Sequence, residues 1–169
     1  MDAEHQYVLH PHSQDVIRHA DYIAGLAKGL QILEAFGVDR QRLNVTQVAE
    51  RTGISRTAAR RHLKTLKFLG YLNTDEHYFW LTPRVLRFSS AYLSSAHLPK
   101  VAQSLLNLLC AQTSLTFSMV VLDEHEVVPI ARSYLPQQDH FRVNPYGMHL
   151  GNRLPAHATS TGKVLLAAL

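Results

Sequence analysis

The sequence contains very little cysteine and no long apolar run. Its one cysteine, Cys110, excludes an internal disulfide and is typical of a protein from a reducing cytoplasm. No apolar stretch approaches the roughly 20 residues that a membrane-spanning helix needs, so we predict no membrane partner. The N-terminus also lacks the apolar core and the cleavage site of a secretory signal. With 46% hydrophobic and 18% charged residues, the composition favours a cytoplasmic globular protein over a disordered chain.

Motifs for catalysis, cofactors and metals are missing as well. Residues 161–163 (TGK) lack the upstream glycine and the following Ser or Thr that a phosphate-binding loop needs. No nucleophile elbow surrounds Ser118, so Ser118, Asp123 and His125 do not indicate a catalytic triad. The histidines of the first 20 residues follow no common metal-ligand spacing. We therefore predict that the protein is not an enzyme and binds no cofactor and no metal.

The strongest local pattern lies in residues 44–69, NVTQVAERTGISRTAARRHLKTLKFL, and predicts two helices joined by a tight turn. Asn44 is placed to cap the first helix together with Gln47, as in a capping box. Gly53 is expected to end that helix, and Ser55 is placed to cap the next one. Apolar residues at helical spacing predict the inward faces: Val45, Val48, Ala49, Ala59, Leu63, Leu66 and Leu69.

Basic side chains gather in the same stretch. Residues 40–70 hold eight Arg and Lys residues against one acidic residue, a net charge of +7, whereas the whole chain carries +4. In the second helix the basic residues repeat opposite the apolar ones: Arg56, Arg60, Lys64 and Lys67. Such a helix suits the major groove, so we predict double-stranded DNA as the partner. The alternatives are a solvated basic face on an ordinary helical hairpin and an RNA partner, for which no RNA-module motif is present.

The flanking segments predict a small winged domain. Residues 21–36 carry an apolar stripe that predicts a first helix packed behind the pair, formed by Ile23, Leu26, Ala27, Leu30, Leu33 and Phe36. Residues 71–74 and 78–81 are β-prone and predict a hairpin, which directly after a recognition helix is a wing. Because Asp75 and Glu76 at the tip would repel phosphates, His77 is the only phosphate contact expected from the wing.

The second half of the chain changes character after a weakly amphipathic helix. Residues 100–111 predict a strongly apolar helix in which Cys110 belongs to the core. Residues 116–122 and 127–131 predict a second hairpin, followed by a loop and a final helix that starts at Thr159 or Ser160. Two strands are too few for a sheet of usual size, so we expect a fragment or an unfinished second domain.

Two motifs resemble the IclR family of bacterial transcription regulators. One is the helix-turn-helix text VTQVAERTGISRTAARRHLKTLKFLGYL, and the other is LGNRLPAHATSTGKVLLA, which is similar to a signature of the family's effector domain. Within the family, ADYIAGLAKGLQILEAFG and SSAYLSSAHLP resemble the subgroup that activates aromatic-acid catabolism. The resemblance covers residues 22–169.

The resemblance implies an α+β protein with four parts. These are a flexible tail (1–20), a winged helix-turn-helix DNA-binding domain (21–83), a linker helix (84–98) and a partial GAF-like effector-binding domain (99–169). It also implies a homodimer or tetramer on paired operator half-sites. The implied function is a ligand-responsive activator, with RNA polymerase as a further partner and p-hydroxybenzoate or a similar aromatic acid as effector. The alternative is a DNA-binding structural protein that takes no small molecule.

The resemblance also assigns site residues. Contacts with DNA are expected from Thr46, Arg56, Thr57, Arg60, Arg61, Lys64 and His77. An aromatic acid needs donors for its carboxylate and apolar walls for its ring, and these are expected from Arg132, Met148, Leu150, His157, Thr159, Ser160, Thr161 and Gly162. Ordinary structural roles remain the alternative for each, such as a surface charge for Arg132 or a helix cap for Ser160.

Overall fold

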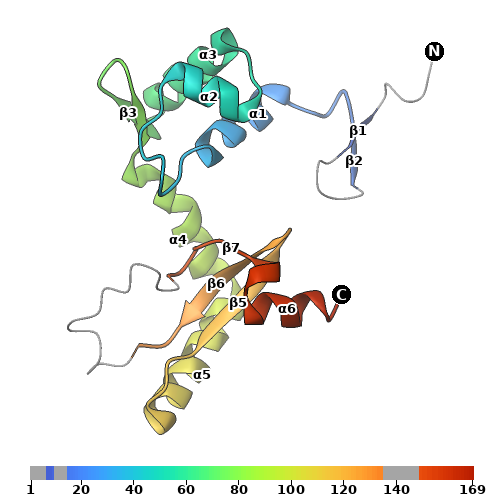
Figure 1. Cartoon of the computed structure of the whole chain (residues 1–169), viewed down its shortest axis with the longest axis vertical. Coiled ribbons are helices and arrows are strands. Elements are labelled where there is room, and N and C mark those ends of the chain that lie inside the picture. Colours follow the sequence, from blue (N-terminus) through green and yellow to red (C-terminus); the bar gives the residue numbers. More distant parts are fainter. Residues whose placement is uncertain (1–6, 10–14, 135–148) are drawn as a thin grey trace. The chain divides into compact units, whose positions relative to one another are not determined.

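The computed structural model describes residues 7–9, 15–134 and 149–169 (Figure 1). The chain forms two compact units, Met1–Arg87 and Phe88–Leu169. Helices and strands occur in both, which confirms the predicted α+β class. Among the described residues, no helix is both long and apolar enough to cross a membrane.

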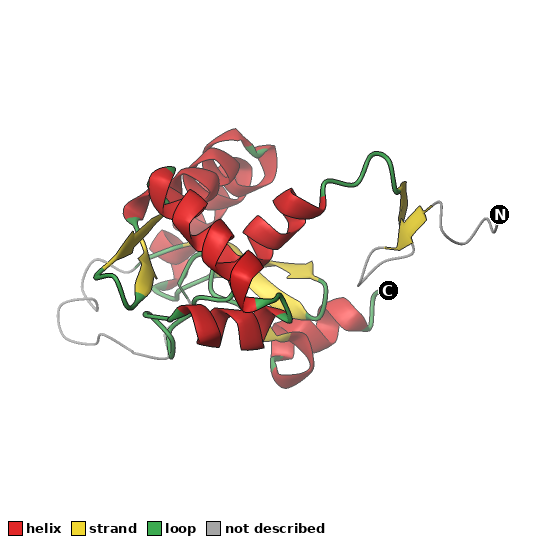
Figure 2. Ribbon diagram, turned by 90° about the horizontal axis from the view of Figure 1, so that it is seen from above, coloured by secondary structure: helices red, strands yellow, loops and turns green. Residues whose placement is uncertain are grey.

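The first unit contains the predicted winged helix-turn-helix. Its helices are α1 (Ala24–Glu34), α2 (Val45–Thr52) and α3 (Arg56–Phe68). The strands β3 (Leu72–Thr74) and β4 (Phe79–Leu81) pair antiparallel and form the wing, and strands are yellow in Figure 2. One apolar core joins helices and wing, and its most deeply buried members are Ile32, Leu43, Val48, Ala59, Leu63 and Leu72.

The local signals of the helix-turn-helix are confirmed. Asn44 and Gln47 form both hydrogen bonds of a capping box at the start of α2. Gly53 adopts φ 66°, in the left-handed region that ends a helix. Ser55 Oγ accepts a hydrogen bond from the Ala58 amide at 3.3 Å, so it caps α3. These residues act over a few positions, which is why the sequence predicts them well.

Two predictions of inward-facing residues are wrong. Ile23, Leu26 and Leu30 are 68%, 61% and 49% exposed, because α1 packs on the core only through its C-terminal part, where Ile32 is fully buried. Leu69 is also exposed, since it follows the end of α3 and Gly70 then turns the chain at φ 81°. The helical spacing is correct, but the core of this small unit does not extend to either end.

The N-terminal segment contains a strand pair where the sequence predicted a flexible tail. Strands β1 (Tyr7–Leu9) and β2 (Val16–Arg18) pair antiparallel, with Val8 opposite Ile17. Arg18 Nε and Asp21 Oδ2 form an exposed ion pair at 2.8 Å just after β2.

A short 3₁₀ turn, η2 (Pro83–Val85), leads into α4 (Leu86–Ser95) and then α5 (His97–Thr113). No residue of α4 is buried, in agreement with its weak apolar face. Helix α5 begins three residues before the predicted Lys100. Pro99 lies in its first turn, where the missing N–H of proline costs no intrahelical hydrogen bond.

The second unit is built on a three-stranded antiparallel sheet of order β5-β6-β7 (Figure 1). Strands β5 (Ser118–Asp123) and β6 (Glu126–Arg132) form the predicted hairpin. Helix α5 packs against it through buried Ala102 and Leu106, and Cys110 is buried as predicted. A further strand, β7 (Leu154–Pro155), pairs with the start of β6 and is not predicted by the sequence pattern. Two residues, one of them proline, carry no strand pattern of their own.

The chain then forms the 3₁₀ turn η3 (Ala156–Ala158) and helix α6 (Ser160–Leu166). Thr159 caps α6, because its Oγ1 accepts a hydrogen bond from the Gly162 amide at 3.0 Å. This start agrees with the predicted one.

Candidate nucleic-acid interface

A concave surface of about 330 Å³ lies between α3 and the wing; we call it the α3–wing groove. Its lining residues are Val45, Arg56, Thr57, Arg60, Lys64, Glu76 and Phe79. Four residues predicted to contact DNA therefore share one surface: Arg56, Thr57, Arg60 and Lys64. All four are exposed, whereas Ala59 and Leu63 on the opposite face of α3 are fully buried. The apolar face thus anchors the helix and leaves three cations together on its free side.

The other three residues predicted to contact DNA do not line the α3–wing groove. Thr46 lies half-buried in the first turn of α2, and Arg61 is exposed on α3. His77 is exposed at the turn of the wing, where its backbone amide donates to Asp75 Oδ1 at 3.2 Å. Their contacts with DNA remain predictions.

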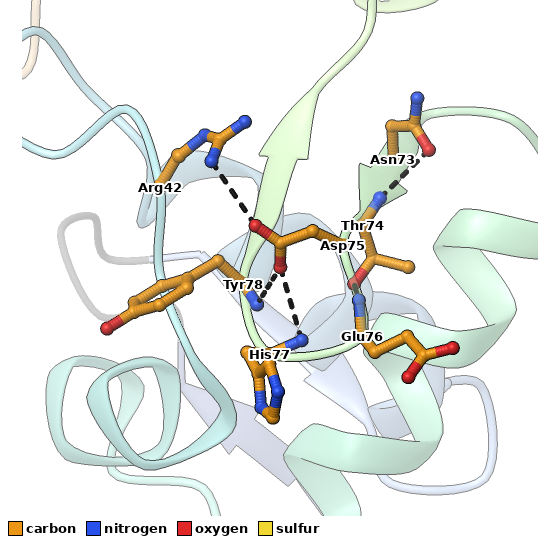
Figure 3. A network of polar contacts seen from close by, with 7 residues as sticks. All are labelled: Arg42, Asn73, Thr74, Asp75, Glu76, His77 and Tyr78. Carbon is orange, nitrogen blue, oxygen red and sulfur yellow. Dashed lines mark hydrogen bonds and ion pairs between the residues drawn. The ribbon is translucent and has the colours of Figure 1, made fainter.

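The tip of the wing is held by Asp75 (Figure 3). Its Oδ1 accepts a hydrogen bond from the Tyr78 amide at 2.7 Å, and its Oδ2 accepts one from Arg42 Nη1 at 3.2 Å. The Arg42 guanidinium also lies over the Trp80 ring, 4.2 Å from its centroid. Arg42 therefore ties the segment before α2 to the wing. The sequence indicates Arg42 only as part of the basic stretch, because no local pattern predicts a contact 33 residues away.

The wing tip is expected to depend on acid. The Tyr78 amide, with help from the His77 amide and Arg42, lowers the pKa of Asp75 below its ordinary value of 3.8. A lowered pKa means that ionised Asp75 stabilises the folded wing above pH 3.8, and that this stabilisation is lost as the pH falls below 3.8. The single tryptophan, Trp80, is a suitable fluorescence reporter. We expect its emission to change below that pH in the wild type, and the Asp75→Asn variant to lack this step. An identical transition in the variant would contradict the role of Asp75.

In the second unit, the predicted effector contacts do not form one group. Arg132 ends β6 opposite Ser118, while the other end of β6 pairs with β7, and the Ala156 amide donates to the His125 carbonyl at 2.8 Å. Arg132 and His157 therefore mark opposite ends of β6, roughly 20 Å apart along the strand at about 3.3 Å per residue. The chain enters η3 beside the β5–β6 turn, which places His157 far along β6 from Arg132.

Most of the remaining predicted effector contacts belong to η3 and the start of α6. The Thr159 hydroxyl and the Gly162 amide are engaged with each other in the cap, and His157 and Ser160 are exposed. The Thr161 hydroxyl oxygen is buried and has no hydrogen-bond partner among the described residues. Leu150 is 40% exposed, and Met148 lies outside the described residues.

Arg153 is a structural residue of this region that no sequence pattern predicts. Its Nε donates to Glu126 and its Nη1 donates to Asp123, both at 2.6 Å. Both carboxylates raise the pKa of the Arg153 guanidinium above its ordinary value, and Glu126 has the larger effect. Arg153 thereby fastens the segment of β7 to both strands of the β5–β6 hairpin.

A winged helix-turn-helix with a cationic recognition helix, followed by a unit of sheet and helices, defines a class of DNA-binding transcription regulator. The model of the IclR helix-turn-helix domain matches residues 25–76, and the model of the bacterial transcriptional regulator IclR C-terminal domain matches residues 90–169. The chain belongs to the IclR family, as its two motifs predicted.

Named relatives agree with this assignment. The p-hydroxybenzoate hydroxylase transcriptional activator of Acinetobacter baylyi is 85% identical over 169 residues, which are 100% of this chain and 62% of the relative. The Pca operon regulatory protein of the same organism is 61% identical, over 93% of this chain and 56% of its own length. An IclR family transcriptional regulator from Brucella abortus has a similar structure, with a TM-score of 0.76 and 25% identity over 89% of this chain and 56% of that one.

These relatives are regulators of transcription and not enzymes, as the sequence predicted. The chain spans about three fifths of the length of the two curated relatives described above.

Proposed function

We propose that this chain is the DNA-binding and effector-sensing part of an activator that responds to p-hydroxybenzoate or a similar aromatic acid. It would act in the cytoplasm on an operon for aromatic-acid breakdown. The observation that carries the proposal is 85% identity, along the whole chain, with a p-hydroxybenzoate hydroxylase transcriptional activator. The 61% identity with a Pca operon regulatory protein supports a role in operon control.

The α3–wing groove is the proposed DNA-binding surface. Arg56, Arg60 and Lys64 lie in it as three exposed cations on one helix face, which suits phosphates and the acceptor edge of guanine. Thr57 at the start of α3 adds a hydroxyl donor for a phosphate. Three residues outside the groove are proposed to contact the DNA backbone beside the bases that α3 reads: Thr46, Arg61 and His77.

The effector is proposed to bind in the second unit at the start of α6. The buried Thr161 hydroxyl, which lacks a partner among the described residues, supports this location because a buried polar group is normally hydrogen-bonded. The other proposed contacts are Met148, Leu150, His157, Thr159, Ser160 and Gly162. Arg132, at the opposite end of β6, remains a separate prediction and is not part of this site. Residues 84–98 would form the linker between a DNA-binding domain (21–83) and this effector domain (99–169).

Activation is proposed to follow from a difference in effector affinity between two arrangements of a homodimer or tetramer. An effector shifts such an equilibrium only as far as it prefers one arrangement. The preferred arrangement would present the DNA-binding units to paired half-sites and allow contact with RNA polymerase.

Isothermal titration calorimetry tests the effector class. The full-length protein and this 169-residue chain are titrated with p-hydroxybenzoate and protocatechuate, with benzoate as a control that lacks the hydroxyl. We expect saturable binding of a hydroxylated acid to the full-length protein. Binding by the shorter chain as well would place the main contacts within it. Absence of heat with both proteins and both hydroxylated acids would overturn the proposed effector.

A further inference from the structure

The α3–wing groove contains one acidic side chain among its lining residues, Glu76. It shares the surface with Arg56, Arg60 and Lys64, yet among the described residues it forms no ion pair with them. Its side chain is exposed. The negative charge of this carboxylate repels DNA phosphates, whereas the three cations of the groove attract them. Glu76 is therefore expected to affect DNA binding differently from its neighbours.

Glu76 differs from the neighbouring Asp75. The Asp75 carboxylate is bound by Arg42 and by backbone amides, whereas the Glu76 carboxylate points to the other side of the turn (Figure 3). Glu76 also adopts φ 81°, a region that glycine enters more easily than a residue with a side chain. Asp75 therefore has a structural role in the wing, and Glu76 has none that its contacts reveal.

We propose that Glu76 determines DNA specificity by repelling phosphates, an inference that rests on the proposed DNA-binding function. Binding to arbitrary DNA depends almost entirely on contacts between cations and phosphates. A carboxylate in the groove weakens every complex in which a phosphate lies beside it. In the specific complex the side chains of α3 hold the duplex in one register, in which Glu76 faces a base-edge donor such as the cytosine amino group.

The test compares Glu76→Gln with Glu124→Gln. Glutamine keeps the size of the side chain and removes its charge. Glu124 is a matched control because it is exposed, lies in the β5–β6 turn of the second unit and also has a positive φ, 55°. The probes are a 30-base-pair duplex selected by the wild-type protein from a randomised pool and a shuffled duplex of the same composition. Affinities are measured by fluorescence anisotropy at one fixed salt concentration.

We expect Glu76→Gln to bind the shuffled duplex about fivefold more tightly, because one like charge is removed near the phosphates. Affinity for the selected duplex should stay the same or fall, so the specificity ratio should decrease about fivefold. Glu124→Gln should leave this ratio unchanged.

Three results would overturn the role of Glu76. Glu76→Gln could bind both duplexes more tightly by the same factor, or its affinity for both could stay unchanged. The specificity ratio of Glu124→Gln could also decrease as much as that of Glu76→Gln. In these cases a wild type that still prefers its selected duplex leaves the proposed function standing. A wild type that selects no duplex from the randomised pool would overturn the proposed function and this inference with it.

Discussion

Gly162→Ala is expected to destabilise the second unit by about 3 kcal/mol, at the upper end of the cost of overpacking a core. A Cβ atom at this position would lie 2.1 Å from the carbonyl oxygen of Ala156 and 2.4 Å from its Cα. Both atoms belong to the backbone of η3, so no side-chain rotation relieves the clash. Either α6 or η3 must move to accommodate the methyl group, next to the cap in which Thr159 Oγ1 accepts a hydrogen bond from the Gly162 amide.

Thermal unfolding followed by circular dichroism measures this effect. Gly29→Ala is the matched control, since Gly29 lies inside α1 and nothing is within 4 Å of its added Cβ. That variant should gain about 0.5–1 kcal/mol, because alanine loses less backbone entropy than glycine in a helix. A wild-type melting temperature for Gly162→Ala would show that α6 does not pack on η3 as described.

Arg60→Ala is expected to weaken binding to a selected duplex by about 1–3 kcal/mol, or roughly 5- to 150-fold, if Arg60 reads a base. Arg60 is exposed and lines the α3–wing groove, and it lies between Arg56 and Lys64 in the sequence of α3. Its fork of donors matches the two acceptors of guanine, a geometry that alanine cannot replace. The loss should be much smaller for a shuffled duplex.

Fluorescence anisotropy at several salt concentrations separates base reading from phosphate binding. The control is Arg51→Ala, which removes the same charge from an exposed residue near the end of α2 that lines a different concavity. Loss of a base contact leaves the salt dependence nearly unchanged, whereas loss of a phosphate contact lowers its slope by about one. If Arg60→Ala and Arg51→Ala lose the same affinity for both duplexes, Arg60 contributes only general charge.

The sequence by itself determined the helix-turn-helix and the basic composition of the exposed face of α3. The caps at Asn44 and Ser55 and the stop at Gly53 depend on hydrogen bonds and backbone angles within a few residues. The helical repeat alone places Arg56, Arg60 and Lys64 on one face of α3. The two hairpins followed from short β-prone runs on either side of polar turns.

Tertiary structure alone decided the features that join distant segments. The pairing of β7 with β6, the clamp of Arg153 and the contact of Arg42 with the wing each connect residues more than 25 positions apart, and no local pattern records them. Leu26 is exposed because the core does not extend to the start of α1. Glu76 lines the α3–wing groove because the wing folds beside α3. Gly162 is a further example. Only glycine fits at this position because the backbone of η3 packs against it, and the sequence near Gly162 does not indicate that contact.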